Sequence, residues 1–242
     1  MDPATPDTIA RMTRRFVLVP GAGGNALYWH RVEPLLRQAG HEVFAVDLPN
    51  WPGATLADQA QAIVSAGAGA DEIVLVAQSM GGFSAPLTVD RSPVVELILL
   101  NPMIPNPGET AGDWWGNTGQ DEARKAMDVR EGRDPDAEFD PETYFLHDLP
   151  PEVAELLRSG EDEQPADSLF GVPFPLYAWP DVPTSVLSGR EDRLLPFDFQ
   201  RRVSVDRLGL EPEPLPGGHL LALSQPESLA QRLLQARGPD GH

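Results

Sequence analysis

Short runs of apolar residues alternate with segments of helical apolar spacing along most of the chain. The runs predict strands over residues 16–19, 42–46, 73–76, 94–100 and 184–187, with a weaker strand over 211–215. The helical spacing predicts helices over 26–39, 56–65, 81–90, 118–129, 151–159, 196–207 and 226–236. Strands that are apolar throughout are typical of a parallel sheet buried on both faces. The order therefore predicts an α/β fold, with a mostly parallel sheet of about six strands and helices on both faces.

The alternation stops between residues 104 and 180. This segment holds nine of the 17 aromatic residues, and 18 acidic against five basic residues. A loop of this length without secondary structure is unusual in a compact domain. We therefore expect an α/β core formed by 1–103 and 181–242, with 104–180 as a helical cap. Its acidic groups lack the glycine turn and terminal Glu of a calcium loop, so we expect a solvated acidic face and no metal site.

Composition narrows the possible partners and location. A net charge of −19 disfavours nucleic acid and anionic membrane surfaces. The absence of cysteine excludes disulfides, thiolate metal sites and a Cys nucleophile. Arg14 and Arg15 resemble part of a twin-arginine export signal, but the apolar run that follows has four residues, against roughly 7–15 in a signal. We expect a cytoplasmic protein with no nucleic-acid or membrane partner, and export is the alternative.

The sequence over 74–82 leads a buried strand directly into Ser79 and then into a helix. Ala77 and Gly81, two positions away on either side, are small, as the tight turn of a nucleophile elbow requires. Such a turn presents the Ser79 hydroxyl beyond the strand and places the Met80 N–H at a helix start. Ala77 replaces the usual first glycine of this motif. A serine in an ordinary turn is therefore the alternative interpretation.

Three further loops follow predicted strands. The glycine-rich loop 20–25 can aim a second N–H at the same point as that of Met80, and its glycines match no phosphate-binding motif. Glu191 and Asp192 follow another strand, and either carboxylate could orient a histidine. Among five histidines, only His219 lies in a glycine-rich loop at a strand's end. The order serine, acid, histidine is that of α/β-hydrolases, and the ends of parallel strands share one sheet edge.

Several segments carry a resemblance to a known family: 16–25, 34–48, the turn at Ser79, 189–200 and 217–233. They resemble the α/β-hydrolase group of plant methylesterases, hydroxynitrile lyases and bacterial esterases. The resemblance implies an α/β-hydrolase fold. It also implies that Ser79 is the nucleophile, Asp192 the acid and His219 the base. The backbone N–H groups of Ala22 and Met80 would form the oxyanion hole. Pro20 stands where the family usually has a histidine. The strand that usually precedes the first parallel strand is missing, so we expect a trimmed sheet of six strands.

From these features we expect a cofactor-independent serine hydrolase that cleaves carboxylic esters through an acyl-enzyme intermediate. The aromatic residues of 104–180 indicate a small apolar or aromatic ester, with Trp114 and Trp115 as candidate substrate contacts. At least one of these two should face the pocket, and the other is as well suited to pack against the core or against a partner. The sequence leaves the oligomeric state open, a homodimer included.

Two other functions remain alternatives. A hydroxynitrile lyase of the related group has a lysine beside the catalytic histidine. In this chain Leu220 follows His219, and the one lysine, Lys125, lies in the 104–180 segment. A non-catalytic ligand receptor of this fold usually lacks one of the three catalytic side chains, whereas this sequence keeps all three.

Overall fold

The computed structural model describes residues 14–159 and 166–236, so His242 and the first 13 residues lie outside it. Six strands form one parallel sheet in the order β2-β1-β3-β4-β5-β6. Their bounds are β1 Arg15–Val19, β2 Glu42–Ala45, β3 Ile73–Gln78, β4 Val94–Leu100, β5 Thr184–Gly189 and β6 Glu213–Leu215. The predicted sheet of six parallel strands is therefore confirmed.

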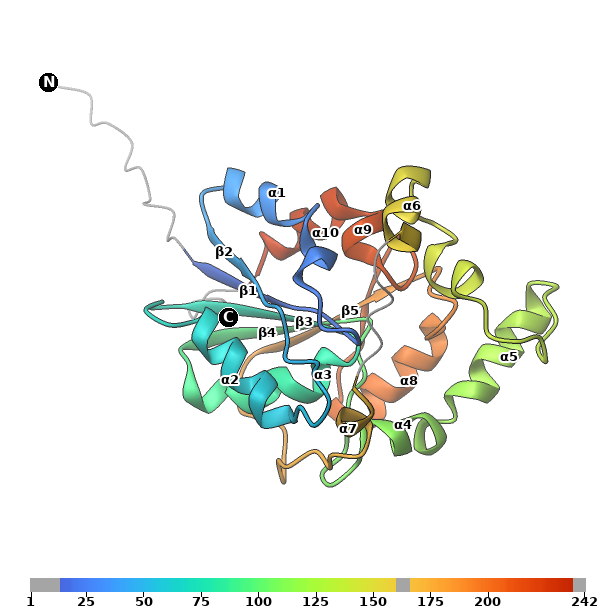
Figure 1. The fold of residues 1–242 in the computed structure, drawn as a ribbon, viewed down its shortest axis with the longest axis horizontal. Coiled ribbons are helices and arrows are strands. Elements are labelled where there is room, and N and C mark those ends of the chain that lie inside the picture. The colour runs from blue at the N-terminus through green and yellow to red at the C-terminus, as the bar shows by residue number, and fades with distance from the viewer. Residues whose placement is uncertain (1–13, 160–165, 237–242) are drawn as a thin grey trace, which may run out of the picture.

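The centre of the sheet is buried on both faces, because alternate side chains of β1, β3, β4 and β5 enter opposite apolar clusters. One face is covered by α2 (Leu56–Ala66), α3 (Gly81–Ser84) and α8 (Phe197–Leu208), and the other by α1 (Glu33–Gln38), α9 (Leu221–Ser224) and α10 (Pro226–Leu233) (Figure 1). Within β4, Leu97 and Leu99 belong to the first cluster, whereas Ile98 and Leu100 belong to the second. Burial on both sides explains the uninterrupted apolar runs 16–19 of β1, 73–77 of β3 and 97–100 of β4.

Prolines account for the main differences from the predicted elements. The helix expected over 26–39 is divided into a 3-10 helix, η1 (Ala26–Trp29), and α1, with Pro34 in the first turn of α1. The helix expected over 81–90 starts as α3 and continues as the 3-10 helix η2 (Ala85–Arg91), whose first turn contains Pro86. A proline lacks the N–H that an uninterrupted helix requires, so each segment changes its geometry there. The last strand is shorter than expected, and Pro214 is tolerated because β6 lies at the sheet edge.

The segment between β4 and β5 contains α4 (Ala111–Thr118), α5 (Gln120–Arg130), the π-helical turn η3 (Glu142–Leu146), α6 (Pro151–Ser159) and α7 (Asp167–Phe170). The helices expected over 118–129 and 151–159 correspond to α5 and α6, whereas α4, η3 and α7 were not predicted. Gly119 separates α4 from α5 because its φ of 65° is left-handed. These helices gather toward one end of the sheet (Figure 1). The division of the chain into core and cap domains stays a prediction.

No helix within 14–159 and 166–236 has the length and apolar character that a bilayer crossing requires. The cytoplasmic location and the possible homodimer stay predictions.

Candidate active site

Ser79 lies in the turn between the end of β3 and the start of α3. Its φ of 50° is in the left-handed region, which non-glycine residues seldom adopt, and this makes the turn tight. A Cβ on Gly82 would lie 2.1 Å from the carbonyl oxygen of Met103, and one on Gly81 would lie 2.7 Å from that of Pro20. Neighbouring loops therefore approach so closely that only glycine fits at both positions after the turn. Ala77 is fully buried, so the strand accommodates its methyl group.

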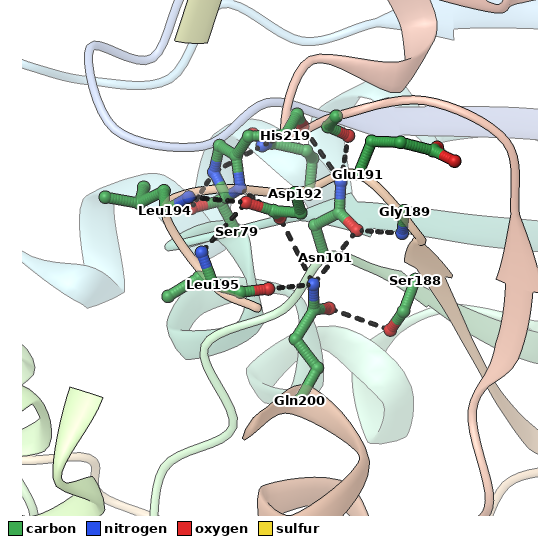
Figure 2. A network of polar contacts seen from close by, with 12 residues as sticks. Ser79, Asn101, Ser188, Gly189, Glu191, Asp192, Leu194, Leu195, Gln200 and His219 are labelled. Carbon is green, nitrogen blue, oxygen red and sulfur yellow. Dashed lines mark hydrogen bonds and ion pairs between the residues drawn. The ribbon is translucent and has the colours of Figure 1, made fainter. Parts of the chain in front are cut away.

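Three of the predicted site residues form one hydrogen-bonded chain. The Nε2 atom of His219 lies 3.2 Å from Ser79 Oγ, and its Nδ1 atom lies 2.8 Å from Asp192 Oδ2 (Figure 2). Ser79 follows β3, Asp192 follows β5 and His219 follows β6, so parallel strands bring all three to one edge of the sheet. The relative exposures are 8% for Ser79, 2% for His219 and 0% for Asp192. A hydrogen-bonded serine, imidazole and buried carboxylate can activate a hydroxyl as a nucleophile.

Asp192 is a buried carboxylate whose hydrogen bonds are satisfied. Oδ1 accepts the backbone N–H groups of Leu194 at 2.9 Å and Leu195 at 2.8 Å. Oδ2 accepts from Gln200 Nε2 at 3.1 Å as well as from His219 (Figure 2). Because a carboxylate only accepts, His219 Nδ1 carries the proton and Nε2 presents its lone pair toward Ser79.

The structure places the neighbouring carboxylate elsewhere. Glu191 Oε2 accepts the backbone N–H of Gly217. Among the contacts of the described residues, none joins the Glu191 carboxylate to the imidazole of His219. Of the two carboxylates that the sequence left open, only Asp192 meets His219.

Asn101 is a site residue that sequence reasoning did not select. Its Nδ2 donates to the carbonyl oxygens of Gly218 at 3.1 Å and His219 at 2.9 Å, while Oδ1 accepts the Gly189 N–H at 2.7 Å (Figure 2). With a φ of 43°, it turns the chain sharply after β4. Asn101 therefore ties the ends of β4 and β5 to the loop of His219. The available signal was a polar residue directly after the apolar run 94–100.

Gln78 is a second residue that the sequence analysis missed. Its Nε2 lies 3.2 Å from His219 Nε2 and 3.5 Å from the carbonyl oxygen of His219. The amide donates to the same imidazole lone pair that faces Ser79, which favours the neutral ring with its proton on Nδ1. The signal in the sequence was an amide side chain directly before Ser79, at the end of an apolar strand.

The segment between β4 and β5 also contacts the loop that carries His219. Asp148 Oδ2 accepts the Gly218 N–H at 2.6 Å, and the Phe145 ring packs edge-on against the His219 ring with centroids 5.5 Å apart. His147 Nε2 donates to the Glu191 carbonyl oxygen at 3.1 Å, and burial lowers the pKa of His147 below its ordinary value. The segment between β4 and β5 therefore contacts both the His219 loop and the loop that carries Glu191 and Asp192.

Ser79 and His219 open onto a mainly apolar cavity of about 160 Å³. Its other lining residues are Ala22, Gln78, Met80, Met103, Trp115, Phe145, Phe170, Leu194 and Leu220. Within the described part of the chain, no hydrogen-bond acceptor meets the backbone N–H of either Ala22 or Met80. Both residues line the cavity together with Ser79.

The two tryptophans that the sequence singled out lie in different surroundings. Trp115 lines the cavity. Trp114 is fully buried in the core, where its Nε1 donates to the carbonyl oxygen of Ile104 at 3.0 Å and its ring packs edge-on against Trp115 and Phe199. Trp114 thus supports Trp115 from behind and does not line the cavity.

Lys125 and possible metal ligands were the remaining groups that the sequence raised for the chemistry of the site. Lys125 forms ion pairs with Asp121 at 3.3 Å and Asp136 at 3.2 Å on α5 and the turn after it. Among the residues that the structure describes, no three or more His, Asp or Glu side chains gather in a way that could hold a metal ion.

Residues 16–232 match the model of the Alpha/beta hydrolase family, and the chain belongs to that family. It is 29% identical to Methylesterase 7 of Arabidopsis thaliana over 92% of this chain and 95% of that protein. It is 30% identical to polyneuridine aldehyde esterase of Rauvolfia serpentina, over 42% of this chain and 43% of that protein. The predicted resemblance to the plant methylesterase group is confirmed.

Solved structures show the same fold. Polyneuridine aldehyde esterase superposes with a TM-score of 0.73 at 21% identity, covering 93% of this chain and 99% of that one. A pyrethroid hydrolase from Sphingobium faniae superposes with a TM-score of 0.70 at 22% identity, covering 93% and 97%. The α/β-hydrolase fold expected from the sequence is confirmed.

Proposed function

We propose that this protein is a serine hydrolase that cleaves carboxylic esters through an acyl-enzyme intermediate. The observation that carries the proposal is the hydrogen-bonded chain from Asp192 through His219 to Ser79, which ends at a tight turn beside an apolar cavity. Relatives of this chain are named methylesterase and esterase, which agrees with the expected class of carboxylic ester hydrolase.

The proposed reaction uses each group at the atom where it lies. Ser79 Oγ bonds to the carbonyl carbon while its proton passes to His219 Nε2, and the resulting oxyanion accepts the N–H groups of Ala22 and Met80. The carbon–oxygen bond to the alcohol then breaks as His219 returns the proton to the leaving oxygen. Water then attacks the acyl carbon while one of its protons passes to His219 Nε2. The bond between this carbon and Ser79 Oγ breaks as His219 returns the proton to Ser79, which releases the acid. Asp192 holds the imidazole and stabilises its cation.

The substrate and the cap are part of the same proposal. Residues 104–180 act as a cap over the core of 1–103 and 181–242, because Trp115, Phe145 and Phe170 of this segment line the cavity over Ser79. Trp115 is therefore the tryptophan that contacts the substrate. The mainly apolar lining and the net charge of −19 favour a neutral, apolar ester.

Neither alternative function gains a supporting observation. The lyase reaction would use a lysine near His219, whereas Lys125 of α5 is paired with the carboxylates of Asp121 and Asp136. A ligand receptor needs no hydrogen bond between His219 and Ser79, whereas this bond is present at 3.2 Å.

The test is a Ser79→Ala variant assayed with p-nitrophenyl acetate and butyrate and with a fluorophosphonate probe. The variant should lose both labelling and turnover, the latter by roughly 10⁶-fold, the scale known for loss of a catalytic serine. Ser65→Ala is the matched control, because Ser65 is an exposed serine on α2 whose hydroxyl bonds to the carbonyl oxygen and side-chain amide of Gln61, far from the cavity. Near-normal turnover or retained labelling in Ser79→Ala would overturn the proposal.

A further inference from the structure

A second and larger cavity adjoins the one over Ser79. Its volume is about 530 Å³, against about 160 Å³ for the inner cavity. Both cavities are lined by Ala22, Phe145 and Leu220, which therefore form the wall between them. Pockets for drug-sized ligands typically measure about 300–1,000 Å³, so the outer cavity can hold a large group and the inner one only a small group.

The position of the shared wall decides which part of an ester each cavity receives. During ester cleavage the alcohol oxygen must lie within reach of His219 Nε2, which protonates it. Leu220 directly follows His219, and the Phe145 ring packs against the imidazole with centroids 5.5 Å apart. The wall thus stands beside the histidine that would protonate the leaving alcohol.

The acyl group takes the opposite direction from the reacting carbon. Apart from the shared wall, the inner cavity is bounded chiefly by Met103, Trp115 and Phe170, which do not border the outer cavity. These side chains enclose the acyl side in the smaller volume.

The outer cavity is suited to a neutral apolar group. Five leucines and a valine from η1, η3, α6 and α9 are among its lining residues, beside the Phe145 ring. Three of these leucines leave much of their surface in water, with relative exposures of 49% for Leu27, 44% for Leu156 and 37% for Leu157. A ligand that covers them gains free energy by removing apolar surface from water.

The charged side chains at this cavity are already paired with each other. Arg158 Nη2 donates to Glu142 Oε2 at 2.7 Å, and Arg158 Nε donates to the other carboxylate oxygen. This bidentate pair leaves the cavity without an unbalanced charge that would select an anion or a cation.

We infer that the outer cavity is the alcohol subsite, and that the preferred substrate joins a short acyl group to a large apolar alcohol. This inference rests on the proposed esterase function. A methyl ester would leave the outer cavity empty and would force a large acyl group into the inner one. The chain should therefore disfavour methyl esters of large acids, although one of its relatives is named a methylesterase.

Two isomeric esters test this preference, because they differ only in the direction of the ester bond. 2-Phenylethyl acetate places the aromatic group on the alcohol, and methyl 3-phenylpropanoate places it on the acid. We expect kcat/KM to be at least about tenfold higher for the acetate, the lower end of the discrimination that apolar pockets achieve. Equal values, or a preference for the methyl ester, would overturn the inference.

Substitutions connect the preference to the outer cavity. Leu156→Gln should lower kcat/KM for 2-phenylethyl acetate and leave that for methyl acetate unchanged. Leu27→Gln should repeat this effect from η1. Val129→Gln is the matched control, since Val129 is 63% exposed on α5 and borders neither cavity. If Leu156→Gln or Leu27→Gln lowers kcat/KM equally for 2-phenylethyl acetate and methyl acetate, or changes neither value, the outer cavity is not the alcohol subsite.

Failure of the proposed function has a different signature. In that case no ester is hydrolysed and the fluorophosphonate does not label Ser79. If Ser79 is labelled and esters are cleaved without the expected preference, only the assignment of the subsites is overturned.

Discussion

The substitution Asp192→Asn changes one atom in the proposed catalytic site and removes its charge. In the native site, Oδ1 of Asp192 accepts two backbone N–H groups, and Oδ2 accepts from Gln200 and His219. The asparagine oxygen can keep the two backbone N–H groups of Leu194 and Leu195. Its amide nitrogen then faces the Gln200 amide and the His219 Nδ1–H, so that donors meet donors.

The imidazole can relieve this conflict by moving its proton from Nδ1 to Nε2. His219 Nε2 would then carry a hydrogen and could no longer accept the proton of Ser79, while the Gln78 amide would also face a donor. A triad histidine in the wrong tautomer costs about 10⁴-fold in kcat in another serine hydrolase. We expect a loss of roughly 10³–10⁴-fold here, which corresponds to about 4–5.5 kcal/mol in the activation free energy.

The assay is kcat and KM for p-nitrophenyl acetate, with circular dichroism to check the fold. Gln200 keeps the carbonyl oxygen of Leu195 as an acceptor, so the folded structure should persist. Glu191→Gln is the matched control, because its side-chain oxygen can still accept the Gly217 N–H, and it should change kcat only mildly. If Glu191→Gln loses more activity than Asp192→Asn, the acid has been assigned to the wrong carboxylate.

Three further changes probe the elements that support the site. Trp115→Ala should alter kcat/KM unevenly across p-nitrophenyl esters of different acyl length, by about 10–200-fold, because Trp115 lines the cavity. Trp114→Ala should instead lower the free energy of unfolding in urea by about 3–5 kcal/mol, because Trp114 is buried in the core. Equal effects of the two variants on selectivity would contradict these placements. Gly82→Ala should abolish hydrolysis or folding, since its Cβ would lie 2.1 Å from a carbonyl oxygen, while Gly116→Ala has nothing within 4 Å and should behave as wild type in both assays. Burial lowers the pKa of His147, so around its ordinary value of 6.5 the folded state binds fewer protons than the unfolded state. The free energy of unfolding should therefore fall as the pH drops through 6.5. This fall should be less steep in His147→Gln.

The architecture and the chain order of the proposed site residues could be predicted from local features of the sequence. Runs that are apolar throughout identified buried parallel strands, because local burial depends mainly on the side chains within each strand. Ser79 was recognisable because the tight turn imposes small residues on its immediate neighbours in the chain. His219 was distinguished from the other histidines by its position in a glycine-rich loop at a strand's end. These features are local, so they can be found without knowing which distant segments meet.

Residues that are adjacent in the chain could be told apart only by their contacts in the folded protein. Glu191 and Asp192 share a loop, yet one reaches the Gly217 backbone and the other reaches His219. Trp114 and Trp115 share a helix, and the 100° between successive helical residues turns one into the core and the other toward the cavity. Sequence patterns cannot separate such neighbours, because the direction of each side chain depends on which remote segment packs against it.

The contacts that position His219 were decided in the same way. Asn101, which is 118 positions away in the chain, donates to its carbonyl oxygen, and Asp148 holds the preceding residue. The partition into two cavities likewise depends on Phe145 meeting the loop after β6. The partners in these contacts are far apart in the sequence. They meet only when the folded sheet brings the ends of its strands together, so a local sequence pattern cannot reveal them.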